Sequence, residues 1–305
     1  MNKLVSGIKK GRRGDVARAI TIVENDPIMA RDIIKEIFKD SKKRATVIGI
    51  TGPAGAGKSS LINSMIVLLE KQKQRPAVLA VDPTSSITGG ALLGDRTRMA
   101  ESMDAGTFIR SLASRGAVGA LAHSVRNCIR ILEYAGFEPI LLESVGAGQT
   151  ETAISEIADA TVVVFNPQTG DSIQAIKAGL TEIGDVYVIN KSDLAGSAQL
   201  YNAVQDYIVG INDTPVLKTS VKRNMGITRL VKEMMNAASI KIGDKEIKNM
   251  RIRAELRDIV LNIITDKTDL LLEKNGAYKR WITKIKNKKI DPYSAALAMT
   301  RGLIK

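Results

Sequence analysis

Apolar residues recur at helical spacing through residues 1–44, with mostly charged residues between them. This spacing is typical of amphipathic helices that bury one face. Asp26-Pro27 marks the start of a new helix within the stretch. The apolar positions are Val16, Ile20, Val23, Ile33, Ile34 and Ile37. We therefore predict an N-terminal helical extension over residues 1–44.

From Thr46 the pattern changes to short β-rich runs that alternate with longer helical patterns. Such alternation is typical of an α/β fold with a mainly parallel twisted sheet and helices on both faces. Ligands of these sheets bind beyond the carboxyl ends of the strands. We predict this domain over residues 45–238. The expected strands are Thr46–Ile50, Ala77–Val81, Pro139–Leu142, Thr161–Phe165, Asp185–Ile189 and Pro215–Leu217.

The strand pattern stops after about Ala238, and helical spacing returns. Ile252, Leu256, Ile259 and Ile263 indicate the first of several amphipathic helices that continue to the end of the sequence. Their apolar stripe must be covered, either by the α/β domain or by a second copy of the chain. We predict a C-terminal helical arm over residues 239–305.

A phosphate-binding motif follows the first expected strand. Residues 52–59 read Gly-Pro-Ala-Gly-Ala-Gly-Lys-Ser, which fits G-x-x-x-x-G-K-[ST] between a strand and a helix. Its glycines let backbone N–H groups surround phosphate oxygens, the lysine reaches the β and γ phosphates, and the serine hydroxyl binds Mg²⁺. The fold is therefore that of a P-loop NTPase. The predicted nucleotide-binding residues here are Gly52, Ala54, Gly55, Ala56, Gly57, Lys58, Ser59 and Ser60.

Carboxylates for the metal and its switches are expected at the same edge of the sheet. Glu143 ends a strand and precedes Gly146 and Gln149. An acid, two residues and a glycine form a sensor of the γ-phosphate, and the glutamine could orient the attacking water. Asp82 closes another strand, and Asp95 lies in the loop that follows. We predict Ser59, Asp82, Asp95 and Glu143 at the metal, with Lys58, Asp82, Asp95, Glu143 and Gln149 as catalytic residues.

The base is indicated by Asn190-Lys191-Ser192-Asp193, which follows a strand and reads N-K-x-D. A carboxylate at Asp193 can accept hydrogen bonds from the N1–H and exocyclic amine of guanine, an arrangement that adenine does not offer. Asn190 would hold the loop, and the stem of Lys191 would cover the ring. Thr219-Ser220-Val221, after a further strand, resembles the segment whose backbone contacts the guanine carbonyl. The sequence predicts GTP and GDP as ligands, with Mg²⁺.

Composition narrows the remaining classes of function. The net charge of +13 could attract nucleic acid, an acidic membrane or an acidic ligand, but 4% aromatic residues leave few platforms for base stacking. We expect no nucleic-acid partner and interpret the basic runs 39–44 and 284–289 as solvated helix ends. No apolar run is long enough to cross a bilayer, so we expect a cytoplasmic protein without a membrane partner. Cys128 is the only cysteine and His123 the only histidine of the sequence, and these two residues are too few to form a usual zinc site.

Together these motifs resemble the methylmalonyl-CoA mutase-associated GTPases, the MeaB or ArgK family, along nearly the whole chain. The resemblance also rests on the stretches 81–86, 89–90 and 93–99, and on Phe108-Ile-Arg110, Gly170-Asp171, Gln174, Lys177 and Asp291-Pro-Tyr293. Ala147, Gly184 and the stretch 111–114 depart from the usual pattern.

The resemblance implies a GTPase that accompanies an adenosylcobalamin-dependent acyl-CoA mutase, gates cofactor delivery and protects or reactivates the mutase. By matching position, Asp82, Asp95 and Glu143 would serve the metal and the switches, and residues 170–177 would be an additional switch. The C-terminal helices would form a homodimerisation arm.

Three alternatives remain at this point. The first is a transport-associated ATPase or kinase of the ArgK type, which the N-K-x-D motif and the lack of an identifiable base for a substrate hydroxyl disfavour. The second is a nickel metallochaperone GTPase, which needs more Cys and His residues than this chain has. The third is a scaffold that binds nucleotide without turnover.

Overall fold

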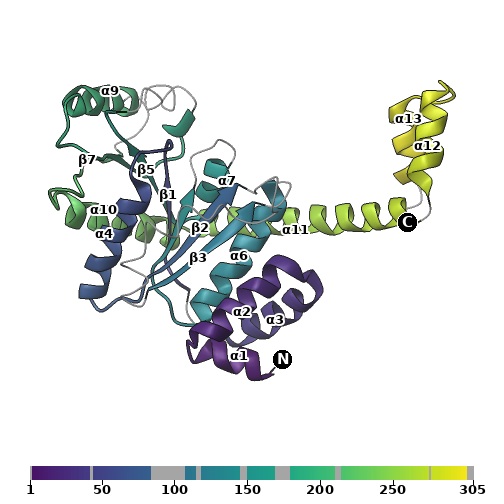
Figure 1. The fold of residues 1–305 in the computed structure, drawn as a ribbon, viewed down its shortest axis with the longest axis horizontal. Coiled ribbons are helices and arrows are strands. Elements are labelled where there is room, and N and C mark those ends of the chain that lie inside the picture. Colours follow the sequence, from purple (N-terminus) through teal and green to yellow (C-terminus); the bar gives the residue numbers. More distant parts are fainter. Residues whose placement is uncertain are drawn as a thin grey trace. The chain divides into compact units, whose positions relative to one another are not determined.

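The computed structural model describes residues 2–41, 44–83, 107–114, 118–144, 150–168, 179–209, 214–274 and 276–300. Within them, a seven-stranded parallel sheet has the strand order β3-β2-β4-β1-β5-β6-β7 (Figure 1). The predicted α/β P-loop fold is confirmed. The strands are β1 (Val47–Thr51), β2 (Ala77–Pro83), β3 (Phe108–Ser114), β4 (Ile140–Ser144), β5 (Ala160–Phe165), β6 (Val186–Ile189) and β7 (Val216–Lys218).

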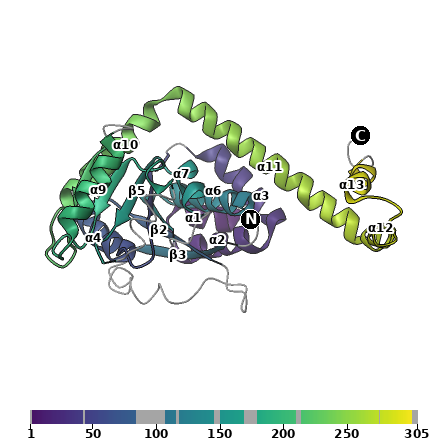
Figure 2. The same ribbon diagram turned by 90° about the horizontal axis from the view of Figure 1, so that it is seen from above.

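Helices cover both faces of this sheet, as the apolar runs in the strands require. The helices are α1 (Asn2–Lys9), α2 (Arg13–Asn25), α3 (Pro27–Asp40), α4 (Lys58–Lys71), α6 (Val118–Tyr134), α7 (Thr150–Ile157), α9 (Ser197–Val209), α10 (Ile227–Gly243), α11 (Lys245–Lys274), α12 (Ala277–Lys286) and α13 (Pro292–Thr300). Alternate strand residues point to opposite faces, so Val47 and Leu79 pack on one side, with α6 and α7, while Ile48 and Val78 pack on the other, with α4. Figure 2 shows these layers from above.

The N-terminal helices pack on α6 instead of directly on most of the sheet. Val16, Ile20, Ile33 and Ile37 are buried in the same apolar cluster as Cys128 of α6. Asp26 caps α3, because its side chain accepts a hydrogen bond from Met29 N–H at 2.9 Å. The helix start expected at Asp26-Pro27 is therefore confirmed.

Strand β3 is the one element of the described sheet that the apolar pattern does not predict. It pairs in parallel with β2 at the sheet edge, in the register Ala77 to Phe108. Arg110 interrupts its apolar character and forms an ion pair with Glu24 of α2 at 2.5 Å. An edge strand that carries a paired arginine lacks the continuous apolar run by which a buried parallel strand is recognised.

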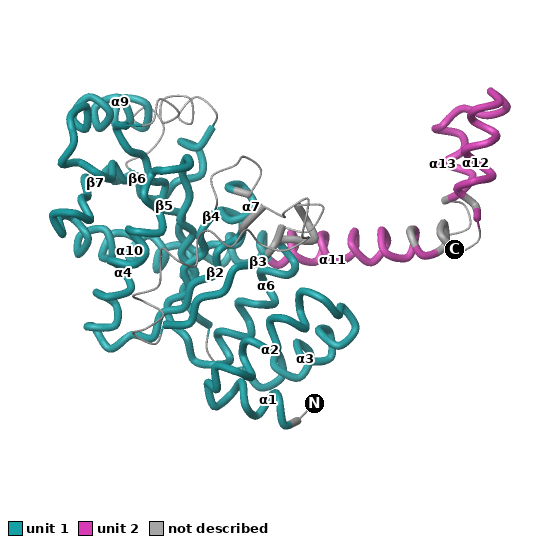
Figure 3. The backbone as a smooth tube through the Cα atoms, viewed as in Figure 1, with its two compact units in different colours: residues 1–251 teal, residues 252–305 magenta. Residues whose placement is uncertain are grey.

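The chain divides into two compact units, residues 1–251 and 252–305 (Figure 3). The first contains the sheet, the N-terminal helices, α10 and the first residues of α11. In the second, α12 packs against α13. None of the described helices is both long enough and apolar enough to cross a bilayer.

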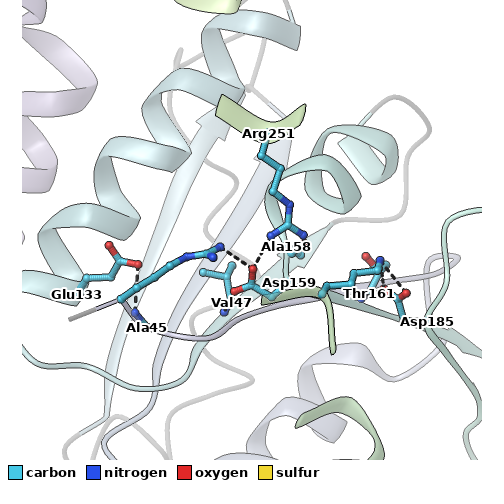
Figure 4. Close-up of polar contacts among 10 residues, drawn as sticks. Ala45, Val47, Glu133, Ala158, Asp159, Thr161, Asp185 and Arg251 are labelled. Atoms are coloured by element: carbon cyan, nitrogen blue, oxygen red, sulfur yellow. Dashed lines mark hydrogen bonds and ion pairs between the residues drawn. The ribbon is translucent and has the colours of Figure 1, made fainter. Parts of the chain in front are cut away.

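At the start of β5, a buried carboxylate joins distant parts of the first unit (Figure 4). Asp159 accepts hydrogen bonds from Val47 N–H at 2.9 Å, from Arg44 at 2.5 Å and from Arg251 at 2.6 Å. Asp185, at the start of β6, repeats the arrangement with Thr161 N–H and the ammonium group of Lys241. The amino ends of β5 and β6 are thus tied to the linker before β1, to the last turn of α10 and to Arg251 of α11.

Candidate functional site

The loop between β1 and α4 has a backbone that only glycine can adopt at two positions. Gly52 has a φ of +139°, and a Cβ there would lie 2.1 Å from the carbonyl oxygen of Val164. Gly57 has a φ of +88°, and a Cβ there would lie 2.5 Å from Asn190 Nδ2. Glycine is therefore required for the loop to lie against the residues at the carboxyl ends of β5 and β6.

Lys58 and Ser59 open α4 and are both buried. The ammonium group of Lys58 donates to the carbonyl oxygens of Gly52 at 2.8 Å and Pro53 at 3.1 Å, so its side chain curls back over the loop. The lysine is thereby held where phosphates would meet the helix N-terminus. Ala54, Gly55 and Ser60 are exposed, whereas Ala56 is buried beneath the loop.

Glu143 lies beside the loop because β4 is the neighbour of β1, with Ile50 opposite Glu143. Its carboxylate is buried, and Oε1 accepts a hydrogen bond from the Ser59 hydroxyl at 2.7 Å. A hydroxyl and a carboxylate are hard oxygen ligands of the kind that Mg²⁺ prefers. These two residues therefore fit the magnesium ion that the sequence predicts.

The remaining predicted metal and switch residues are only partly within the described chain. Asp82 belongs to β2, where its backbone pairs with Ala113. Strand β2 is the other neighbour of β4, so Asp82 ends a strand at the same edge as Glu143. Asp95, Gly146, Gln149 and the segment 170–177 lie outside the described residues.

The N-K-x-D segment follows β6 and braces the phosphate loop. Asn190 is buried and its Nδ2 donates to the carbonyl oxygen of Ala56 at 3.0 Å. Lys191 Nζ donates to the carbonyl oxygen of Gly55 at 3.1 Å. Lys191 has a φ of +52°, a left-handed conformation uncommon for a residue with a long side chain. The predicted base-reading and phosphate-binding residues are thus joined by direct hydrogen bonds.

Asp193 is oriented by the segment after β7. The Ser220 hydroxyl donates to Asp193 Oδ1 at 2.5 Å, and this hydrogen bond lowers the pKa of the carboxyl group below its usual value. Lys222 and Arg223 lower this pKa further. The Asp193 carboxylate therefore stays ionised, and able to accept hydrogen bonds, to a lower pH than an ordinary aspartate.

The segment after β7 also contacts the N-K-x-D loop through its backbone. Thr219 Oγ1 donates to Asn190 Oδ1 at 3.2 Å, and Ser192 N–H donates to the Thr219 carbonyl at 3.0 Å. Ser220 N–H donates to the Met225 carbonyl at 3.0 Å, so Ser220 faces the site through its hydroxyl. Val221 is half-buried and packs against the core beside it. The two loops therefore form one connected structure.

Asn166 is a residue of this site that the sequence analysis missed. It follows β5 directly, is buried, and donates from Nδ2 to the carbonyl oxygen of Gly55 at 2.9 Å. Its position in the sequence could have indicated this role, because Asn166 directly follows one expected strand and Asn190 directly follows the next. Without the strand order, that signal does not show that both side chains reach the same loop.

Cys128 and His123 take no part in this site. Cys128 is fully buried in α6, where desolvation raises the pKa of its thiol far above the usual range. The imidazole of His123 is 3.1 Å from the Asn127 amide on the same helix. Among the described residues, no group of three or more His, Cys, Asp or Glu side chains could hold a metal ion.

A sequence model of the family described as methylmalonyl-CoA mutase-associated GTPase MeaB matches residues 16–274. The chain belongs to the MeaB family. As a member, it is a P-loop GTPase.

Relatives match this chain over all or part of its length. A Pyrococcus abyssi protein named as a GTPase is 40% identical, over 100% of this chain and 97% of its own. The mouse protein named methylmalonic aciduria type A homolog, mitochondrial, is 37% identical over 63% of this chain and 50% of its own. The crystal structure of a LAO/AO transport system kinase has a TM-score of 0.71 at 21% identity, covering 100% of this chain and 97% of that one, and shows the shared fold.

Proposed function

We propose that this protein is a GTP-binding and GTP-hydrolysing chaperone of an adenosylcobalamin-dependent acyl-CoA mutase, of the methylmalonyl-CoA mutase type. It would gate cofactor delivery and protect or reactivate the mutase. The observation that supports the guanine assignment is the hydrogen bond from the Ser220 hydroxyl to Asp193, which orients the carboxylate. The hydrogen bond from Asn190 to the Ala56 carbonyl joins this base-binding segment to the phosphate loop. The proposal that the partner is a mutase rests on the description of the family.

In this proposal the residues 52–60 surround the nucleotide phosphates, and Lys58 neutralises the charge on the β and γ phosphates. Ser59 and Glu143, with Asp82 and Asp95, would hold Mg²⁺, which supplies charge stabilisation between the phosphates when bound. Gly146 would sense the γ-phosphate, and Gln149 would orient the attacking water. Asn190, Lys191, Asp193, Ser220 and Val221 would bind the guanine ring.

In this proposal the C-terminal helices, assigned to residues 239–305, would form a homodimerisation arm, and residues 45–238 would form the GTPase domain. Large apolar side chains of α11 are exposed, among them Leu256 at 57% and Ile264 at 54%. A second copy of the chain would cover them. We place the protein in the cytoplasm, without a nucleic-acid or membrane partner.

The test is a titration of the purified protein with fluorescent GDP and fluorescent ADP in Mg²⁺. We expect GDP to bind more tightly by orders of magnitude, because a buried polar site rejects a base that leaves its groups without partners. Equal binding of ADP would overturn the guanine assignment and favour the ATPase or kinase of the ArgK type. The likeness to the transport kinase structure does not favour that alternative, since at 21% identity it concerns the fold alone.

The partner is tested by following phosphate release from GTP with and without a cobalamin-dependent mutase from the same source. A change in the hydrolysis rate is expected, and an unchanged rate would remove the partner while leaving the GTPase site intact. Linkage gives a second measurement. If the mutase binds the GTP form of this protein more tightly than the GDP form by some factor, it must raise the protein's affinity for GTP relative to GDP by that same factor.

A further inference from the structure

Two asparagines occupy equivalent positions on neighbouring strands. Strands β5 and β6 pair in parallel, with Phe165 opposite Ile189. Asn166 directly follows β5 and Asn190 directly follows β6, and both side chains are buried. Their side chains therefore approach the phosphate loop from adjacent strand ends.

The two side chains hold consecutive peptides of that loop. Asn166 donates to the Gly55 carbonyl at 2.9 Å, and Asn190 donates to the Ala56 carbonyl at 3.0 Å. In a planar trans peptide, the carbonyl of one residue and the N–H of the next residue point in opposite directions. A hydrogen bond that holds the carbonyl therefore also sets the direction of that N–H. In the Gly55–Ala56 peptide, that N–H donates to the Pro53 carbonyl at 3.2 Å and closes the turn of the loop. Asn166 thus helps to fix the peptide on which the turn depends, together with Lys191 Nζ, which donates to the same carbonyl from an exposed position at 3.1 Å.

The other end of the Asn166 amide contacts the chain that leaves β5. Its Oδ1 accepts a hydrogen bond from Gln168 N–H at 2.7 Å. One buried side chain therefore bonds to the phosphate loop through its nitrogen and to the backbone of Gln168 through its oxygen. A movement of the amide that follows one partner therefore changes its hydrogen bond to the other.

We propose that Asn166 is a positioning residue that couples the phosphate loop to the segment after β5. Nucleotide that fixes the loop would strengthen the Gln168 contact, and loosening of that contact would weaken nucleotide binding by the same linkage. This inference rests on the proposed nucleotide site. It gives Asn166 no contact with the reacting atoms.

Two substitutions separate the two hydrogen bonds. Asn166→Ala removes both, whereas Asn166→Asp keeps an acceptor for Gln168 N–H and places a carboxylate oxygen against the Gly55 carbonyl. Asn127→Ala is the matched control, because Asn127 is also a buried asparagine but its amide contacts His123 and Arg130 on α6. Fluorescent GDP affinity, thermal unfolding without nucleotide and amide hydrogen exchange at Gln168 are measured for all variants.

We expect both Asn166 variants to lose about tenfold or more in GDP affinity, as for a buried hydrogen bond, while Asn127→Ala stays within about twofold. In the wild type, GDP should slow exchange at Gln168, and in both Asn166 variants this effect should disappear, because each of them breaks the bond to the Gly55 carbonyl. Without nucleotide, Gln168 N–H should keep its protection in Asn166→Asp, which retains the acceptor, and lose it in Asn166→Ala. A purely structural role would lower the unfolding temperature without changing the response of Gln168 to GDP.

Two results would overturn the inference, and they differ from a failure of the proposed function. If wild type binds GDP and both Asn166 variants bind it equally well, Asn166 does not position the loop. If GDP protects Gln168 equally in wild type and Asn166→Ala, the coupling is absent. A wild-type protein that binds no guanine nucleotide would overturn the nucleotide site itself, and the inference with it.

Discussion

The Ser59 hydroxyl donates a 2.7 Å hydrogen bond to Glu143 Oε1, which joins the first turn of α4 to the carboxyl end of β4. Both groups are buried, so the contact is shielded from bulk water. Buried oxygen ligands at a helix N-terminus form a site in which a cation and phosphates can be bound together.

Glu143→Gln should therefore reduce GTP hydrolysis by about a hundredfold or more, because the amide keeps the shape but loses the charge that would hold the proposed metal ion. Phosphate release at saturating GTP is the measurement, together with the Mg²⁺ concentration needed for half-maximal GDP binding. Glu133→Gln is the control, since Glu133 is a partly buried glutamate that accepts from Ala45 N–H, before β1. Equal loss in both variants would contradict a specific role for Glu143.

Asp193→Asn should shift preference away from guanine nucleotides. The amide would present a donor to the guanine N–H groups from which Asp193 is proposed to accept, and GDP affinity should fall by about a hundredfold or more. Competition of GDP and other nucleoside diphosphates against a fluorescent nucleotide measures the shift. A variant that keeps its preference for GDP would show that Asp193 does not bind the base.

Ser220→Ala tests how Asp193 is oriented. Removal of the hydroxyl removes the largest influence that lowers the pKa of Asp193, so that pKa should move toward its ordinary value. We expect a smaller loss of GDP affinity than in Asp193→Asn, about tenfold. A titration of the Asp193 carboxyl by NMR follows the pKa directly, and an unchanged pKa would show that the hydrogen bond has no influence in solution.

The sheet and the site motifs could be predicted because their signals are local. The runs in β1, β4 and β5 are mostly apolar and are buried at every position, and residues 52–59 contain the glycines that their own backbone requires. Contacts between distant residues give no such signal. Arg251 bonds to Asp159 across 92 residues of sequence, and nothing in either residue's neighbours predicts the partner. Asn166 became a candidate only when the strand order placed β5 beside β6.

Asp159→Asn should destabilise the protein by about 3 kcal/mol, because the change removes the charge that compensates the arginines Arg44 and Arg251. Urea unfolding at neutral pH, followed by circular dichroism, measures the free energy of unfolding. Glu233→Gln is the control, since its partner Arg229 lies 4.0 Å away and is 73% exposed. That variant should change stability by less than about 1 kcal/mol. A similar effect in both variants would contradict the role given to Asp159.

Glu133 gives the stability a pH dependence of known sign. Burial raises the pKa of its carboxyl group to about 7, although the Ala45 N–H and Arg44 act in the opposite direction (Figure 4). In the unfolded chain the group ionises near its ordinary pKa of about 4.3. Between these values the folded protein holds a proton that the unfolded chain has lost, so the free energy of unfolding falls as pH rises toward 7.

Glu133→Gln removes this dependence, because the amide resembles the protonated acid and can still accept from Ala45 N–H. Its stability should match that of wild type near pH 4.5 and exceed it above pH 7, by about 2 to 3 kcal/mol at most. Urea unfolding of both proteins in steps from pH 4.5 to 8 measures the difference. If the two curves stay parallel across that range, Glu133 is ionised in the folded protein at low pH, and its burial does not raise the pKa as described.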